Sequence, residues 1–318
     1  MHEIEFIEME NFLGLGRAIK IQGHNVEVVV TIDVGPRIMQ FSKLGGINIF
    51  EDNVEESTIL PDGTQYKIYG GHRLSHSPEA FPRSYISDSS PLEKYEKLND
   101  GIRMYQNIEQ WTQIQKIIEV HLLSEKVKIV NKLVNKGAWP IEFSAWSITV
   151  VPPDGLEVCP ITQRDTGLLP NTYYVFWPYS RTNDSRLKWG QKYIIIKGNR
   201  NEQAPFKFGY YNEYGWTAYF NRGMLFIKKF TNSVNSAYPD FGCNYETYTT
   251  YWGTELETLS PLQVVNPDET IVHEEEWYLF ESDYPTEDEE QISLKLSNFV
   301  DATGIRLPEK IVRKERMV

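Results

Sequence analysis

The sequence predicts a mostly β protein built from packed antiparallel sheets, with one helix near the C-terminus. Short runs rich in β-branched and aromatic residues recur along most of the chain. Gly, Pro, Asn or Asp bound these runs, as expected where strands end in turns. Only one stretch, close to residue 290, has clear helical spacing of its apolar residues.

The first half of the chain contains two strand pairs. In VEVVVTIDVGPRIMQF, residues 26–41, the pair Gly35-Pro36 predicts a bend between two strands. Residues 110–123 and 127–135 are separated only by a short polar link, which predicts a long antiparallel hairpin. Helical spacing fits neither run.

The second half continues as strands and ends in the helix. Six further strands are expected at 141–151, 192–197, 216–220, 223–230, 245–252 and 274–280. Thr286 and Glu289 fit a capping box, which predicts that the helix begins there. Ile292, Leu296 and Phe299 share one helical face, so the helix is expected to pack on the outside of the sheets.

The chain shows no division into parts. Its 318 residues contain no linker, shift in composition or repeat of fixed period. Because 41% of the residues are hydrophobic and 24% charged, a substantial core can be buried. We therefore expect residues 1–318 to form one domain, although this is longer than most single domains.

Charge and composition exclude several classes of partner. A net charge of −12 argues against nucleic acid, whose phosphates need a basic surface. The acidic start MHEIEFIEMEN is unlike a signal peptide, and no apolar run is long enough to cross a membrane. A cytoplasmic location is expected. Cys159 and Cys243 are too few for a disulfide framework and are predicted to be buried thiols.

The stretch YGGHRLSHSPEAFPRSY, residues 69–85, is expected to be a loop, since it is too irregular in pattern for a strand. Paired glycines can bring its backbone close to a ligand. Its candidate donors to a ligand are His72, Arg73, His76 and Arg83. The alternative is a solvated loop whose arginines pair with some of the 44 acidic residues.

Other chemistries have little support. His72 and His76 are four residues apart, but Pro78 and the lack of a third ligand argue against a metal site. No nucleophile elbow and no glycine-rich phosphate loop occurs, so no cofactor is expected. Carboxylate and imidazole chemistry remains.

The segment ELETLSPL, residues 255–262, places Glu255 and Glu257 on the same face of a strand, because side chains alternate with a period of two. On a solvated face the pair has no special meaning. In a pocket, two neighbouring carboxylates raise one pKa and give a candidate proton carrier. Upstream, Asp240 is expected in a turn and Glu246 in the following strand.

Together these motifs resemble the galactose mutarotase (aldose 1-epimerase) superfamily, and specifically an uncharacterised bacterial branch of it. The resemblance runs through most of the chain and rests on ordered segments rather than on one motif. These segments are VGPRIMQF, GGHRLSHSPEAFPRSY, RTNDSRLKWGQKY, GWTAYFNRGMLFIKKF, DFGCNYETYT, GTELETLSPL and HEEEWYLF.

The resemblance implies a galactose mutarotase-like β supersandwich with a groove for a hexose ring across one sheet. It also implies ring opening and reclosure that interconverts the α and β anomers. Leu256, Glu257 and Thr258 match the family's base segment, so Glu257 is the candidate base and Glu255 its neighbour in substrate binding. Arg37, Arg73, Arg83 and Asp240 lie in the branch's segments and are candidates for binding hydroxyls or an anionic group.

The candidate acid departs from the family pattern. Mutarotases carry an acidic histidine after a central strand, whereas the corresponding region here, NKGAWPIEFSAWSITVV, contains none. His72 resembles a position near the family's other sugar-binding histidine and is taken as the catalytic acid, with His76 as the alternative donor.

Three functions follow from these observations. The first is a mutarotase acting on a free hexose or a related sugar. The second is a carbohydrate-binding protein without turnover, which the absent histidine suggests. The third is a mutarotase for a sugar phosphate, gripped by Arg73 and Arg83. In each case the partner is a small-molecule carbohydrate, and the sequence does not define the oligomeric state.

Overall fold

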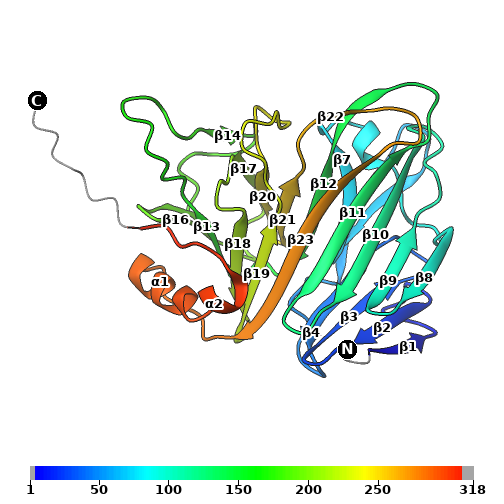
Figure 1. Ribbon diagram of the computed structural model, residues 1–318, viewed down its shortest axis with the longest axis horizontal. Coiled ribbons are helices and arrows are strands. Elements are labelled where there is room, and N and C mark those ends of the chain that lie inside the picture. The colour runs from blue at the N-terminus through cyan, green and yellow to red at the C-terminus, as the bar shows by residue number, and fades with distance from the viewer. Residues whose placement is uncertain (1–3, 310–318) are drawn as a thin grey trace, which may run out of the picture.

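Two large antiparallel sheets lie face to face and enclose most of the core (Figure 1). The computed structural model describes residues 4–309. Within that range no helix is long and apolar enough to cross a lipid bilayer. The sheets are antiparallel and packed, as predicted from the short β-branched and aromatic runs of the sequence.

The first sheet, called the front sheet, has eleven strands. In spatial order they are β1 (Glu5–Met9), β2 (Ala18–Gln22), β3 (Val26–Thr31), β4 (Ile38–Lys43), β7 (His72–Ser77), β12 (Ile141–Val151), β21 (Thr254–Leu259), β20 (Tyr245–Thr249), β17 (Phe206–Tyr210) and β14 (Tyr174–Phe176), with β22 (Gln263–Val265) paired to β12.

The second sheet, called the back sheet, has ten strands. In order they are β15 (Leu187–Trp189), β16 (Tyr193–Lys197), β13 (Leu156–Pro160), β18 (Trp216–Asn221), β19 (Met224–Phe230), β23 (Thr270–Glu281), β11 (Val127–Asn135), β10 (Ile114–Leu122), β9 (Gly101–Tyr105) and β8 (Lys94–Leu98).

A few smaller elements complete the fold. They are the hairpin β5 (Val54–Ile59) and β6 (Gln65–Tyr69), a 3-10 turn η1 (Arg83–Tyr85), and the helices α1 (Glu289–Ser297) and α2 (Val300–Thr303). The two helices lie beside β18 and β19 (Figure 1). Ile292 and Leu296 of α1 are buried against the outer face of the back sheet, as the apolar spacing predicted.

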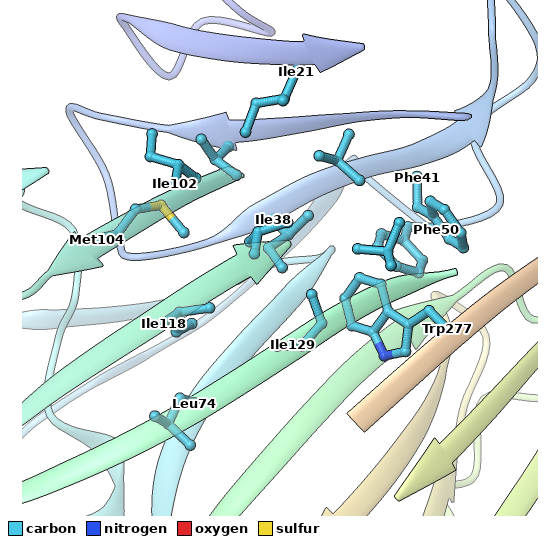
Figure 2. Packing of buried hydrophobic residues seen from close by; sticks show 14 of the residues in the cluster. Ile21, Ile38, Phe41, Phe50, Leu74, Ile102, Met104, Ile118, Ile129 and Trp277 are labelled. Atoms are coloured by element: carbon cyan, nitrogen blue, oxygen red, sulfur yellow. The ribbon is translucent and has the colours of Figure 1, made fainter. Parts of the chain in front are cut away.

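The main apolar core lies between the two sheets. It joins strands β2, β3, β4 and β7 of the front sheet to β9, β10, β11 and β23 of the back sheet. Figure 2 shows Trp277 of β23 next to Phe41 and Phe50, and their ring centres lie 5.7 and 5.3 Å from that of Trp277. Tilted and edge-on aromatic contacts of this kind add to the hydrophobic stabilisation of the interface.

A polar cluster interrupts this core behind β21. Lys228 of β19 is fully buried and its Nζ lies 3.1 Å from Oε1 of Glu275 on β23. The same ammonium donates to Oγ1 of Thr149 and to the backbone carbonyl of Leu256, both at 2.9 Å. Thr258 of β21 donates to Glu275 at 2.6 Å. Hydrogen bonds thus attach the inner face of β21 to the back sheet, and burial of the charges is compensated by pairing.

The structure confirms most of the predicted elements and corrects two. The hairpin of β10 and β11 and the strand pair around Gly35-Pro36 form as expected. The segment after Gly71 is a buried strand, β7, and not a loop, because it pairs with β12 through six residues. The helix is capped by Asp288, whose carboxylate accepts from Gln291 N at 3.0 Å, and not by Thr286.

Replacing Lys228 tests how much the polar cluster contributes to the free energy of unfolding. Lys228→Met leaves the Glu275 carboxylate buried without its cation, so we expect the free energy of unfolding to fall by about 3 to 5 kcal/mol. The matched control is Lys94→Met, because Lys94 pairs with Glu96 at 3.1 Å while both side chains are exposed. That change should cost about 0 to 1 kcal/mol. Urea unfolding measures both, and equal losses would contradict the assigned role of the buried pair.

Candidate active site

One pocket opens on the outer face of the front sheet, over β7, β12, β21, β20 and β17. Its volume is about 570 Å³, within the usual range for small-molecule sites. Side chains alternate on each strand, so the residues of these strands that line the pocket all lie on the outer face of the sheet. The lining comprises Tyr66, Ile68, Arg73, Glu79, Ala80, Phe81, Ser84, Tyr85, Trp146, Ile148, Trp177, Tyr179, Pro205, Lys207, Asp240, Tyr248, Trp252, Glu255 and Glu257.

The two glutamates of β21 both face this pocket, as alternation predicted. Between them Leu256 points into the core, while Glu255 and Glu257 are 6% and 0% exposed. Glu255 accepts a hydrogen bond from the guanidinium of Arg73 at 2.8 Å. A buried, paired carboxylate of this kind fixes the orientation of the arginine.

Glu257 has the most unusual environment in the pocket. Its Oε2 accepts from the indole Nε1 of Trp146 at 2.7 Å and from Nζ of Lys207 at 2.9 Å. Its Oε1 is buried and receives no hydrogen bond from any described residue. Burial raises the pKa of Glu257 to about 7, against the opposing effect of Lys207. A carboxyl group whose pKa is raised in this way takes up and releases a proton closer to neutral pH than an ordinary glutamate does.

Lys207 connects three carboxyl groups, and two of them, Glu79 and Glu257, line the pocket. Its Nζ lies 2.9 Å from Oε2 of Glu257, 2.9 Å from Oε2 of Glu246 and 3.7 Å from Oε2 of Glu79. Glu246 lies directly opposite Glu257 in the β20–β21 ladder. Burial alone would lower the pKa of Lys207, but these carboxylates raise it well above its usual value. Burial raises the pKa of Glu246, which Lys207 opposes.

Four of the residues predicted from sequence meet in this pocket. They are Arg73, Asp240, Glu255 and Glu257. Asp240 lies in the expected turn before β20 and accepts a hydrogen bond from Ser77 at 3.3 Å. Arg73 keeps Nε and one terminal nitrogen buried and without a partner among the described residues.

The two histidines proposed as acids lie elsewhere. His72 points into the interior, where its ring meets Trp277 edge-on at 4.8 Å and its Nδ1 lies 2.8 Å from Thr149 Oγ1. His76 is also buried, with Nε2 3.8 Å from Glu109. Burial lowers the pKa of His72 to about 3 and that of His76 to about 4. Alternation on β7 explains this placement, because Arg73 between them faces the pocket.

The remaining two arginines bond to the protein's own backbone and side chains. Arg37 donates to the carbonyl of Ile68 at 2.6 Å and to the carboxylate of Asp88 at 2.9 Å, and is fully buried. Arg83 donates to the carbonyl of Pro78. Neither residue lines the pocket. The two-arginine grip on a phosphate, formed by Arg73 and Arg83, is therefore not assembled in this pocket.

Lys207 and Trp146 were not predicted from the sequence, although Lys207 left a signal. In the strand Phe206–Tyr210, a lysine stands among Phe206, Phe208 and Tyr210, whose side chains all enter the core. A lone cation on the opposite face of such a strand indicates a site.

Among the described residues that line the pocket, none is a histidine. No group of three or more His, Cys, Asp or Glu side chains within residues 4–309 is arranged to hold a metal ion.

Comparison with known proteins supports the fold. No family model matches the chain, and no curated protein matches its sequence. A crystal structure of a TPR-domain-containing protein from Parabacteroides distasonis matches with a TM-score of 0.58 and 14% identity, over 85% of this chain. The chain spans about half of that protein, 48% of its length.

Two further crystal structures match over nearly their whole lengths. A candidate aldose 1-epimerase from Klebsiella pneumoniae has a TM-score of 0.51 and 10% identity, covering 99% of this chain and 92% of its own. A candidate mutarotase from Salmonella typhimurium has a TM-score of 0.50 and 8% identity, covering 88% and 94%. At such identities the likeness shows the fold, and it confirms the galactose mutarotase-like fold predicted from the sequence.

The hydrogen bond from Trp146 can be tested through the titration of Glu257. Trp146→Phe removes a donor that stabilises the carboxylate, so we expect the pKa of Glu257 to rise above its wild-type value. The matched control is Trp252→Phe, which changes another tryptophan of the pocket that donates no hydrogen bond to Glu257. Carbon-13 NMR titration of labelled glutamate, assigned with Glu257→Gln, measures the change. An unchanged midpoint in Trp146→Phe would contradict this description.

Proposed function

We propose that this chain, which has the galactose mutarotase-like fold, is a carbohydrate-binding isomerase that interconverts the anomers of a hexose or related sugar. The single observation that carries the proposal is Glu257. It is a fully buried carboxylate with a pKa of about 7 and one oxygen without a partner among the described residues, and it lines a pocket large enough to hold a hexose. A general base works best when its pKa lies close to the operating pH.

The lining of the pocket suits a sugar ring. Aromatic side chains such as Trp177, Tyr179 and Trp252 offer apolar surface for the carbon face of a pyranose. Arg73 offers free donors, while Asp240 and Glu255 offer acceptors for hydroxyl groups. A few convergent polar groups within an aromatic lining are typical of small-molecule sites.

The reaction needs one proton removed and one supplied. Glu257, as a carboxylate, accepts the proton of the anomeric hydroxyl while a second group protonates the ring oxygen. The bond between the anomeric carbon and the ring oxygen then breaks and leaves an open-chain aldehyde. After rotation of the aldehyde group the ring closes on its other face, and the two proton transfers run in reverse.

The charges favour an uncharged sugar over a sugar phosphate. Glu79, Asp240, Glu255 and Glu257 line the pocket, against the two cations Arg73 and Lys207. Arg73 is already paired with Glu255. A phosphate would meet uncompensated carboxylates, which makes its binding costly.

A binding protein without turnover is the second candidate. The observation in its favour is the absence of histidine from the described residues that line the pocket. Calorimetry and exchange NMR distinguish the two functions, because a pure binding protein would hold a sugar without speeding the exchange of its anomers.

Substitution of the two β21 glutamates separates chemistry from binding. Glu257→Gln should lower kcat for anomer interconversion by about 100- to 10 000-fold, because the amide cannot accept the proton. Glu255→Gln is the matched change on the same face of the same strand, and it should act mainly on KM by loosening Arg73. Saturation-transfer NMR between the anomeric protons of glucose and galactose measures both. Wild-type protein that binds these sugars without accelerating exchange would count against an isomerase.

The pH dependence follows from the protonation of Glu257. Because only the carboxylate accepts a proton, kcat/KM should rise with pH through a midpoint of about 7 and level off above it. The measurement is the enzymatic rate after subtraction of the buffer-catalysed rate at each pH. A midpoint near the ordinary glutamate pKa of about 4.3 would exclude Glu257 in this environment as the base.

A further inference from the structure

Lys207 is held in an unusual position for a lysine. Its side chain is only 4% exposed, yet it lines the pocket from the outer face of β17. The ammonium lies 4.9 Å from the ring centre of Trp146 and 4.5 Å from that of Trp177. Two aromatic faces and three carboxyl groups therefore surround one cation, which is far more than a lysine needs for solubility or packing.

The reaction places a strict geometric demand on the acid. The anomeric oxygen and the ring oxygen are bonded to the same carbon, so the groups that serve them must lie side by side. Only Lys207 and Trp146 donate to the carboxylate of Glu257 among the described residues. An indole N–H does not release its proton in water, and the arginine guanidinium retains its own. The lysine ammonium is the remaining donor beside the base.

The lining tyrosines are poorer candidates. The hydroxyl of Tyr85 donates to Glu79 and not toward Glu257. None of these hydroxyl groups donates to Glu257.

We propose that Lys207 is the general acid of this site, and that it forms with Glu257 a proton relay in place of the histidine that the site lacks. This inference rests on the proposed isomerase function. It follows from the 2.9 Å contact between Lys207 Nζ and Glu257 Oε2, and from the position of both groups at the floor of one pocket.

The relay conserves protons and electrons. Glu257 takes the proton from the anomeric hydroxyl, and the electron pair of that O–H bond forms the carbonyl. The bond between the anomeric carbon and the ring oxygen breaks, and its electron pair takes a proton from the ammonium of Lys207. The carboxylic acid and the neutral amine then remain in contact, and the proton passes from Glu257 to Lys207 along their hydrogen bond. Both groups return to their starting states without solvent.

Coupling between the two charges explains how a firmly protonated lysine can act as an acid. In the resting site the carboxylates of Glu246, Glu257 and Glu79 raise the pKa of Lys207. When Glu257 takes up the substrate's proton, one of these negative charges disappears and the ammonium becomes more acidic. The acid is therefore strengthened at the moment when the ring oxygen needs a proton. Asp240, Tyr85, Tyr179 and Tyr248 also face this part of the pocket.

Two substitutions separate proton transfer from charge. Lys207→Arg keeps the cation but cannot give up a proton, so we expect kcat to fall by at least about 100-fold while calorimetry still detects sugar binding. Lys207→Ala should be equally slow, and added methylamine should restore part of its rate by entering the space left by the side chain. The control is Glu257→Gln, which retains the lysine and should gain nothing from methylamine.

The outcomes distinguish this proposal from the function on which it rests. If wild-type protein accelerates anomer exchange and Lys207→Arg does so equally well, the lysine supplies only charge and the relay is wrong. If Lys207→Ala binds sugar but methylamine does not restore its rate, the relay is also wrong. If wild-type protein binds sugars without accelerating their exchange, the isomerase function and the relay fail together. Loss in Lys207→Arg with rescue of Lys207→Ala supports the relay.

Discussion

A buried ammonium behind β21 fixes the strand that carries both site glutamates. Lys228 donates to the backbone carbonyl of Leu256, the residue between Glu255 and Glu257, and is itself paired with Glu275 on the opposite sheet. Thr258 adds a second link from β21 to Glu275 at 2.6 Å. Side chains alternate between the two faces of a strand. Contacts that hold the inner-face residues of β21 in place therefore also fix the positions of its outer-face residues. The position of Glu257 thus depends on contacts behind β21, on the side of the strand that faces away from the pocket.

The pKa values of the buried glutamates are shifted in opposite directions on the two sides of β21. Behind the strand, Lys228 holds the pKa of Glu275 well below its usual value although burial alone would raise it. In the pocket, Lys207 is shared by several carboxyl groups, and burial dominates, so the pKa of Glu257 rises to about 7. One cation for one carboxylate gives a fixed ion pair, whereas one cation for several carboxylates leaves a proton that can move. The same residue types therefore build a structural link on one face and, in the function we propose, the proton-transfer groups on the other.

The sequence predicts those parts of the fold and site that depend on local pattern. Alternation was enough to place Glu255 and Glu257 on one face, and short β-branched runs located the hairpin of β10 and β11. The strand β7 was missed because its residues are polar, and their hydrogen bonds come from β12, about 70 residues later in the chain. His72 and His76 were therefore expected in a loop that binds a ligand. In the structure, alternation along β7 turns both side chains away from the pocket. Lys207 was missed because its importance lies in contacts with β21 and β20, which no local pattern records.

In the proposed reaction a sugar lies with its anomeric carbon over the Glu257–Lys207 pair. The most direct measurement is a crystal structure of Glu257→Gln with bound glucose or galactose, since the slow variant retains the bound ring. We predict that the anomeric oxygen lies within hydrogen-bonding distance of residue 257 and the ring oxygen within that distance of Lys207 Nζ. A ring bound with its anomeric carbon toward Asp240, or a sugar bound outside this pocket, would contradict the account.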